Sequence, residues 1–383
     1  MAAFSSMKET PSPGIEISEE WSAAADTIAK SFTRSLPPTV FICGAKNSGK
    51  TTFSRYLLNT FLPRYKSVAY LDTDVGQPEF TPPGCLSLTI IDEETLDLTI
   101  PCLKTPQRCY FFGDVSSKRD PETYLNCIYA LYDHYRKDLR ISCKSGSPGA
   151  AELPLIINTP GWVKGLGFDI LVDILKHIAA THVVKINISS GEKNLPSGAF
   201  WLDDLDECSV NLVEITPARK DSYNRSVLVQ KKARLIRELR LMAYFRQCFP
   251  SSMSITTIKE LALALASLTP YQVPISSIKI RHLHCEVPNS EVFYSLNATI
   301  VGLAVSCEDS QSLPVCVGLG IVRGIDTLKN VIYLITPVPQ SILAGVDLLL
   351  QGYIQIPTGL LQVQGCMSPY MSANVVTVQG LSQ

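Results

Sequence analysis

A phosphate-binding loop is the first feature of the sequence that could do chemistry. Residues 44–51, GAKNSGKT, match the pattern GxxxxGK[ST]. An apolar run typical of a strand, residues 39–43, precedes the loop, and a run typical of a helix, residues 52–62, follows it. In this strand–loop–helix context, backbone N–H groups and the helix N-terminus face phosphate oxygens. The predicted nucleotide-binding residues are Gly44, Ala45, Lys46, Asn47, Ser48, Gly49, Lys50, Thr51 and Thr52.

Two side chains of this loop have predicted roles in phosphate chemistry. Lys50 is expected to reach the β and γ phosphates, and the Thr51 hydroxyl is expected to ligate Mg²⁺. The chain contains no NKxD tetrapeptide, the guanine-reading motif of GTPases, and Asn158 stands where many GTPases carry an acid. These features disfavour a switch GTPase, so ATP with Mg²⁺ is the predicted nucleotide.

Two carboxylates follow the next apolar run of the chain, residues 67–71. Asp72 and Asp74 are separated by one residue, so on a strand they would point the same way. Ligands of open α/β sheets bind outside the carboxyl ends of the strands, which places this pair beside the phosphate-binding loop. One carboxylate could organise Mg²⁺ and its water, and the other could accept a proton from an attacking hydroxyl. Asp74 lies farther along the strand, which favours Asp72 for Mg²⁺, and Gln77 could orient a nucleophile or an acceptor strand. The alternative interpretation is a solvated turn at the end of the strand.

The elements that would position these residues alternate between strand and helix from about residue 38 onward. This alternation predicts an α/β fold of the P-loop NTPase type, with a doubly wound and mainly parallel sheet. Short β-rich runs separated by Gly, Pro and Asn turns then predict a smaller C-terminal β-rich domain. We therefore expect a flexible leader over residues 1–36 with one short helix near 20–33, a P-loop domain over 37–265, and the β-domain over 270–383.

Composition narrows the class of protein. The 383 residues contain 34 Lys and Arg against 35 Asp and Glu, for a net charge of −1, which excludes a globally basic nucleic-acid coat. The 12 cysteines include no CxxC pair, so a zinc ribbon is not expected. No run approaches the ~18–20 apolar residues that span a bilayer, and the first residues contain no apolar stretch typical of a signal peptide. We expect an intracellular protein without membrane contact.

Four segments together resemble the polynucleotide 5′-hydroxyl kinase family, in particular its nucleolar branch, which acts in pre-rRNA processing. The segments are GAKNSGKTT (44–52), DTDVGQPEFTPPG (72–84), FFGDVSSKRDPETY (111–124) and NTPGWVKGLGFDIL (158–171). They occur in the family's order over about residues 38–250, and residues 270–383 fit the family's C-terminal β-domain more loosely.

The resemblance implies an activity and its cofactors. A member of this family transfers the γ-phosphate of ATP to the 5′-hydroxyl end of single-stranded RNA, with DNA as an open alternative acceptor. Lys50 and Thr51 would then hold ATP and Mg²⁺, and Asp74 would act on the 5′-hydroxyl. The resemblance further implies an endoribonuclease partner in pre-rRNA processing. It also implies a location in the nucleus, specifically the nucleolus.

The resemblance also points to residues that would hold the acceptor. Trp162 resembles the tryptophan that stacks on the terminal base, and Lys164 beside it completes a platform for a single strand. The alternative for Trp162 is a packing role at the edge of the domain. The GDxS segment resembles a substrate-side loop, and Gly113, Asp114 and Ser116 are the matching residues.

A basic segment, residues 219–246, resembles the family's mobile lid. Arg234, Arg237 and Arg240 lie three residues apart on a predicted helix, and apolar residues gather on the opposite face. We expect these arginines to stabilise charge on the transferred phosphoryl group. A solvated helix face or an RNA-backbone patch is the alternative.

Two other functions are compatible with the motifs. One is a catalytically weak ATP-binding scaffold for an RNA-processing nuclease, against which intact Lys50, Thr51 and Asp74 argue. The other is a P-loop kinase that acts on a free nucleoside. The appended β-rich segment and the basic segment favour a polymer as the acceptor.

Overall fold

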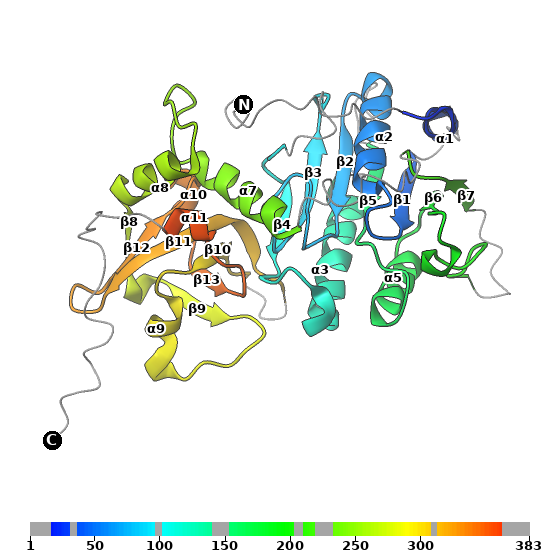
Figure 1. Cartoon of the computed structure of the whole chain (residues 1–383). Coiled ribbons are helices and arrows are strands. Elements are labelled where there is room, and N and C mark those ends of the chain that lie inside the picture. Colours follow the sequence, from blue (N-terminus) through cyan, green and yellow to red (C-terminus); the bar gives the residue numbers. More distant parts are fainter. Residues whose placement is uncertain are drawn as a thin grey trace.

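The structure is a computed structural model, and it describes residues 17–30, 37–95, 102–139, 153–202, 210–218, 233–307 and 312–361. Two β-sheets lie side by side, each accompanied by helices (Figure 1). Among the described residues, no helix is both long enough and apolar enough to cross a bilayer.

The first sheet has seven strands in the order β4-β3-β2-β5-β1-β6-β7. Its strands are β1 (Thr39–Gly44), β2 (Val68–Asp72), β3 (Cys85–Ile91), β4 (Arg108–Phe111), β5 (Leu155–Asn158), β6 (His182–Ile186) and β7 (Asn211–Ile215). The pairs β2–β3 and β3–β4 are antiparallel, and the other four neighbouring pairs are parallel. The prediction of a doubly wound, mainly parallel sheet of the P-loop type is therefore confirmed. Strands β3 and β7 were not predicted.

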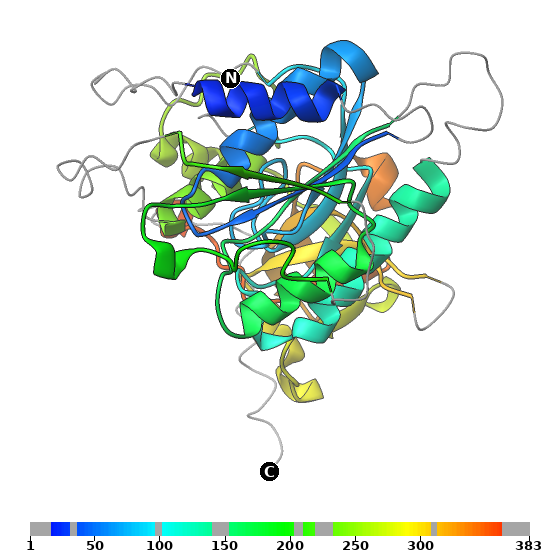
Figure 2. The ribbon, with the colours of Figure 1, turned by 90° about the vertical axis from the view of Figure 1, so that its right-hand side faces the viewer.

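Helices cover both faces of this sheet. They are α1 (Glu19–Lys30), α2 (Lys50–Tyr65), α3 (Pro121–His134), which continues into a turn of π-helix, η2 (Tyr135–Leu139), and α5 (Leu166–His177). Alternate residues of β1 face opposite sides, so Val40 and Ile42 pack with α1 and α2, while Phe41 and Cys43 pack with α3 and α5. Figure 2 shows the helix, sheet and helix layers after a 90° turn from the view of Figure 1.

The second sheet has six strands in the order β8-β12-β11-β10-β13-β9, and only β13–β9 is a parallel pair. Its strands are β8 (Tyr271–Pro274), β9 (Lys279–His282), β10 (Ile300–Val305), β11 (Val315–Asp326), β12 (Val331–Ile335) and β13 (Leu348–Gln351). Helices α7 (Ala233–Arg246), α8 (Ile258–Ser267), α9 (Val292–Leu296), α10 (Gln340–Leu343) and α11 (Thr358–Leu361) accompany this sheet. Short 3₁₀ turns are η1 (Ser117–Arg119), η3 (Gly191–Lys193), η4 (Ile275–Ser277) and η5 (Asn289–Glu291). The predicted C-terminal β-rich part is confirmed.

Helix α7 packs with the second sheet, in a hydrophobic cluster that also includes Cys85 and Phe111 of the first sheet. Leu241 and Phe245 of α7 belong to the same hydrophobic cluster as Ile300 and Leu319, and α8 joins that cluster through Leu261. Figure 1 shows both helices along one side of the six-stranded sheet, with α7 reaching toward β4. The domain boundary near residue 265 stays a prediction, and these contacts favour a boundary that precedes α7.

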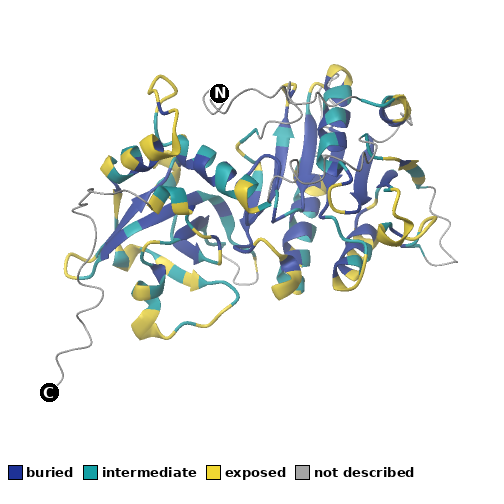
Figure 3. Cartoon of the chain, viewed as in Figure 1, coloured by how far each residue is buried: buried dark blue, intermediate teal, exposed yellow. Residues whose placement is uncertain are grey.

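The two sheets share a buried interface. Cys85 and Phe111 of the first sheet lie in the hydrophobic cluster of the second. The Phe111 ring covers Gly302 so closely that a Cβ there would come within 2.6 Å of the ring. Tyr353, just after β13, donates its backbone N–H to Gly113 O at 2.6 Å. In Figure 3 the strands of both sheets are largely buried, and exposed residues gather on peripheral helices and loops.

Residues 17–30 contain the short helix predicted near 20–33, but this helix is packed into the core and is not part of a flexible leader. They form α1, whose apolar residues at helical spacing pack against α2. Trp21 is 1% exposed, lies edge-on to Phe53 with ring centroids 5.2 Å apart, and donates Nε1–H to Thr216 O at 2.7 Å. The Glu20 carboxylate accepts hydrogen bonds from the backbone N–H and the hydroxyl of Thr216. Helix α1 therefore belongs to the core beside the phosphate-binding loop.

Candidate active site

Four loops that the sequence singled out leave the same edge of the first sheet. Strands β1, β2 and β5 are parallel neighbours, and β4 is separated from β2 by two antiparallel steps, so all four end at this edge. The loops also touch one another. A Cβ on Gly161 would come within 2.5 Å of the Lys46 backbone, and one on Gly76 within 2.9 Å of Val115 O.

The phosphate-binding loop has the backbone that an anion site requires. Gly44, Asn47 and Gly49 adopt positive φ angles of 146°, 62° and 97°, which curl the backbone into a concave loop. Helix α2 begins at Lys50 without a side-chain cap on its first N–H groups, so these donors remain open to a ligand. The Ser48 hydroxyl is buried and has no hydrogen-bond partner among the described residues. These donors fit the phosphates of ATP.

The Lys50 side chain lies on the inner side of this loop and contacts its backbone. Its ammonium donates a hydrogen bond to Ala45 O at 2.8 Å, and the side chain is buried. Burial lowers the pKa of Lys50 to about 8, and the nearby Asp74 carboxylate opposes this shift. The ammonium therefore lies where it can exchange a backbone carbonyl for a phosphate oxygen.

Asp72 ends β2 and is 1% exposed. Its Oδ1 accepts hydrogen bonds from Asp74 N at 3.2 Å and Asn158 Nδ2 at 3.1 Å, and its Oδ2 accepts one from Glu79 N at 2.5 Å. Burial raises the pKa of Asp72 to about 7, the nearby Asp74 carboxylate adds to this shift, and the hydrogen bonds that Asp72 accepts oppose it. A divalent cation at this place would favour the ionised carboxylate.

The oxygen atoms near Asp72 fit Mg²⁺. The Thr51 hydroxyl lies 3.5 Å from Asn158 Oδ1, so Asn158 connects Thr51 with Asp72. Among the described residues, no three His, Cys, Asp or Glu side chains form a metal-binding group. Mg²⁺ in nucleotide sites uses one or two protein oxygens together with phosphates and water, and it needs no such group.

Asp74 has a different position from Asp72. The expectation that the two side chains point the same way assumes a continuous strand, but β2 ends at Asp72 and Asp74 lies in the segment that follows. Asp74 Oδ1 accepts hydrogen bonds from Gly76 N and Gln77 N, each at 3.0 Å. Its Oδ2 has no partner among the described residues, and Asp74 is partly exposed. This arrangement leaves one carboxylate oxygen open to an incoming hydroxyl group.

The tryptophan loop lies next to the phosphate-binding loop. Trp162 is half-buried, and its ring lies edge-on to Tyr124, with centroids 5.5 Å apart, and against Gly167 of α5. The Tyr124 hydroxyl donates to Thr73 O at 2.6 Å, which ties this aromatic pair to the aspartate turn. Lys164 is exposed. The tryptophan thus has both packing contacts and an accessible part.

The substrate-side loop is organised by Asp114. This carboxylate is buried, and Oδ1 accepts from Ser116 N at 3.2 Å while Oδ2 pairs with Arg119 Nε at 3.0 Å. Ser116 itself is exposed, and Gly113 has a φ of 78°. Asp114 therefore shapes the loop, and Ser116 is the group that faces solvent.

The three arginines of α7 do not share one environment. Arg234 is exposed and pairs with Glu238 at 2.8 Å, and Arg237 is half-buried. Arg240 is buried and its Nη2 lies 3.2 Å from Glu79 Oε2, while its Nε and Nη1 have no partner among the described residues. The three arginines therefore do not share one exposed face, since Leu241 and Phe245 anchor this part of α7 in the core and Arg240 is buried. Their role at the transferred phosphoryl group stays a prediction.

Glu79 and Asn158 are the site residues that sequence reasoning missed. Glu79 is buried in the turn between β2 and β3 and also pairs with Arg55 of α2 at 3.0 Å. Its backbone N–H holds Asp72, so one residue connects α2, α7 and the carboxylate. The sequence offered two signals for these residues. They are an acid inside a proline-rich turn and an amide at the end of the strand beside β2.

Arg240→Ala is expected to destabilise the protein by about 3 kcal/mol, because it removes one partner of a buried carboxylate. Arg234→Ala, on the exposed face of the same helix, should change stability by about 0.5 kcal/mol or less. Urea unfolding of the two purified variants against wild type measures both effects. Equal midpoints for the two variants would show that the buried pair has no such role.

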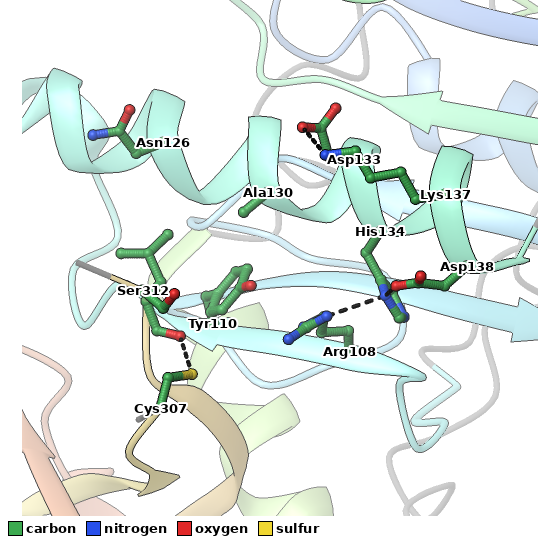
Figure 4. A pocket seen from close by; sticks show the side chains of 11 residues that line it. Arg108, Tyr110, Asn126, Ala130, Asp133, His134, Lys137, Asp138, Cys307 and Ser312 are labelled. Atoms are coloured by element: carbon green, nitrogen blue, oxygen red, sulfur yellow. Dashed lines mark hydrogen bonds and ion pairs between the residues drawn. The ribbon is translucent and has the colours of Figure 1, made fainter. Parts of the chain in front are cut away.

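The cavity in Figure 4 lies outside this site. It has a volume of about 450 Å³ and is lined by residues of β4, α3, η2 and the segments that flank 308–311. Arg108 lies at the start of β4, away from the carboxyl edge, and its Nη1 contacts His134 at 3.1 Å. His134 in turn pairs with Asp138 at 2.6 Å, and Lys137 pairs with Asp133. Lys137 and His134 thus have acidic partners, whereas Arg108 Nε is buried without a hydrogen-bond partner among the described residues.

Comparison with known proteins agrees with this geometry. The family described as mRNA cleavage and polyadenylation factor CLP1 P-loop matches residues 44–247, and that described as NOL9-like, C-terminal domain, matches residues 266–357. A solved structure of the wild-type Clp1p–Pcf11p complex superposes with a TM-score of 0.58 at 18% identity, covering 87% of this chain and 77% of that one. This similarity supports the fold alone.

Curated relatives share more of the sequence. A polynucleotide 5′-hydroxyl-kinase NOL9 of Arabidopsis thaliana is 59% identical over 94% of this chain and 96% of its own length. The protein of the same name from Bos taurus is 32% identical over 88% of this chain, which spans 53% of that relative. A Schizosaccharomyces pombe polynucleotide 5′-hydroxyl-kinase, grc3, is 35% identical over 43% of this chain and 23% of its own length. The chain therefore belongs to the polynucleotide 5′-hydroxyl-kinase family.

Proposed function

We propose that this protein transfers the γ-phosphate of ATP to the 5′-hydroxyl end of a polynucleotide, with single-stranded RNA as its acceptor. The position of Asp74 carries the proposal. Asp74 keeps one carboxylate oxygen open and lies close enough to Lys50 to affect the pKa of that lysine. It also follows β2, whose neighbour β5 leads into the tryptophan loop. A proton acceptor, a phosphate-binding ammonium and a surface for a base thus share one edge. The names of the relatives support the same activity.

The residues of the site divide the work of phosphoryl transfer. Lys50 and the backbone amides at the start of α2 would bind the β and γ phosphates. Thr51 and Asp72 would hold Mg²⁺, which when bound neutralises charge on the phosphates. Asp74 Oδ2 would accept the proton of the 5′-hydroxyl as that oxygen attacks. Arg234 and Arg237, the more accessible arginines of α7, would stabilise the negative charge.

The acceptor could also be a free nucleoside, and a competition experiment separates the two substrates. The protein is given ATP, a 5′-hydroxyl RNA oligonucleotide and a nucleoside at equal concentration. We expect nearly all transferred phosphate on the oligonucleotide, because base stacking and backbone contacts add to its binding. Preferential phosphorylation of the nucleoside would overturn the proposal. Absence of transfer to either acceptor would favour the ATP-binding scaffold.

Trp162→Ala is expected to raise the KM for short RNA acceptors by about five- to hundredfold with little change in the KM for ATP. The reason is the loss of base stacking, worth about 1–3 kcal/mol. Trp162→Phe keeps an aromatic face and should recover much of the loss. Steady-state kinetics with both substrates measures these effects, and thermal melting checks the fold. A variant that melts early but has an unchanged KM when folded would leave Trp162 a packing residue.

The cellular setting follows from the resemblance to the nucleolar branch. We propose that the RNA acceptor is a pre-rRNA spacer end, that the partner is the endoribonuclease whose cleavage leaves a 5′-hydroxyl, and that the protein works in the nucleolus. Purification of the tagged protein from nucleoli with an RNase activity that creates its substrate would support this setting. Exclusive recovery with a cytoplasmic or DNA-repair assembly would contradict it.

A further inference from the structure

We propose that Arg119 and Tyr353 form a second acceptor subsite, which binds the RNA strand downstream of its 5′-terminal nucleotide. The inference rests on the proposed function, because it extends the path of the same substrate. The subsite lies where the substrate-side loop of the first sheet meets the end of β13 in the second sheet.

A continuous row of rings connects the tryptophan loop with this subsite. Each neighbouring pair has centroids 6.0 Å apart or less. The rings, in order, are Trp162, Tyr124, Phe112, His284 and Tyr353. The middle of the row is buried, whereas Trp162 is half-buried and Tyr353 is 42% exposed. The two accessible aromatic ends are therefore held at a fixed separation.

Hydrogen bonds fix the row to the catalytic edge. Tyr124 donates to Thr73 O, next to Asp74, and His284 Nε2 donates to Phe112 O at 2.7 Å. The loop that begins at Gly113 accepts the Tyr353 backbone N–H at 2.6 Å. The position of Tyr353 is thus coupled to the turn that carries the proposed proton acceptor.

Arg119 is oriented on two sides and open on a third. Its Nε pairs with Asp114 Oδ2 at 3.0 Å, and its guanidinium carbon lies 4.5 Å from the centroid of the Tyr353 ring. The side chain is still 56% exposed, and Nη1 and Nη2 have no partner among the described residues. A planar guanidinium whose orientation is fixed and whose two amino groups are free can donate to two oxygens of one phosphate.

The direction of the loop leads from the reacting end to this arginine. Val115 O abuts Gly76 in the aspartate turn, and η1 then carries Lys118 and Arg119 away from it toward Tyr353. Asp114 is buried and paired with Arg119, and Asp120 is half-buried and lies beside His284. The exposed groups of η1 are basic, so they complement an RNA backbone. Arg119 lies over the Tyr353 ring and His284 stacks on the same ring, so a nucleotide contacts the exposed edge of Tyr353 while Arg119 holds the adjoining phosphate.

The test compares acceptors of two lengths. Wild type, Arg119→Ala and Tyr353→Ala phosphorylate a 5′-hydroxyl dinucleotide and an RNA of about 16 nucleotides, the upper range of single-strand sites. We expect both variants to raise the KM of the long RNA by about five- to hundredfold and to leave the dinucleotide and ATP values near wild type. Tyr294→Ala, an exposed tyrosine of α9 in the same part of the protein, is the matched control and should change neither.

Equal effects on both lengths, or no effect on either, would overturn the subsite. Because Arg119 and Tyr353 also tie the two sheets together, Arg119→Gln and Tyr353→Leu, which remove the charge and the ring but keep more of the side-chain volume, serve if an alanine variant does not fold. Tyr353→Phe keeps the ring and should bind the long RNA like wild type.

Direct binding separates this inference from the proposed function. Fluorescence anisotropy of the labelled long RNA needs no catalysis, so weaker binding by Arg119→Ala would support the subsite even if no phosphate were transferred. Loss of one phosphate contact should also reduce the slope of log affinity against log salt by about 0.7 for Arg119→Ala, but not for Tyr353→Ala. Wild-type affinity and slope in both variants would overturn the inference while leaving the kinase activity intact.

Discussion

Lys50→Ala is expected to lose phosphoryl transfer while it keeps its fold and its affinity for RNA. The ammonium is the one side-chain cation that the phosphate-binding loop turns inward, and removing such a donor costs at least about 10²–10³-fold in kcat. Stability should not fall. Burial already lowers the pKa of Lys50 to about 8, which means that the folded protein bears a cost for this buried charge.

The assay is transfer of labelled γ-phosphate to a 5′-hydroxyl RNA at about pH 7, where Lys50 with a pKa of about 8 is mostly protonated. Lys259→Ala on the exposed surface of α8 is the matched control. ATP phosphates should raise the pKa of Lys50, so wild-type ATP affinity should weaken as the pH rises through about 8, and this dependence should vanish in Lys50→Ala. Wild-type turnover by the pure variant would overturn the assignment of the ATP site.

Asp74→Asn is expected to reduce kcat by about 10²–10⁴-fold with little change in ATP affinity. Asparagine keeps an oxygen that can accept the Gly76 and Gln77 N–H groups, so the turn should persist while the basic oxygen is lost. The increase in barrier is about 3–5 kcal/mol. Phosphoryl transfer has a loose transition state and needs limited help from a base, which places the effect toward the lower end.

Single-turnover rates with saturating ATP and RNA measure this effect at about pH 7. The pH matters because the Asp74 carboxylate raises the pKa of Lys50, and its removal would lower that pKa below its value of about 8. Asp72→Asn is the informative comparison, since Asp72 is buried and held by three hydrogen bonds. A fall of less than about threefold in Asp74→Asn would move the proton-accepting role to Asp72 or to metal-bound water.

The positions of the α7 arginines and of helix α1 depend on contacts between residues far apart in the chain, which sequence patterns do not encode. Helical spacing predicted that Arg234, Arg237 and Arg240 share a face, and they do lie on one helix. Which of them is buried depends on Glu79, 161 residues away in the chain. Similarly, a short helix was predicted near residue 20, but its place beside the phosphate-binding loop depends on Thr216, which accepts the Trp21 N–H from 195 residues away.

The sequence by itself determined the phosphate-binding loop, the mainly parallel sheet and the β-rich C-terminal part. Their signals are local: glycine spacing, strand–helix alternation and turn residues act within a few residues of the backbone they shape. Only the tertiary structure decided that Asp72 is buried and Asp74 open, that Arg240 points inward, and that five rings from α3 and from segments following strands of both sheets form one row. Those outcomes depend on which distant side chains fill the same space, because burial of a charge or a ring is decided by its neighbours and not by its own type.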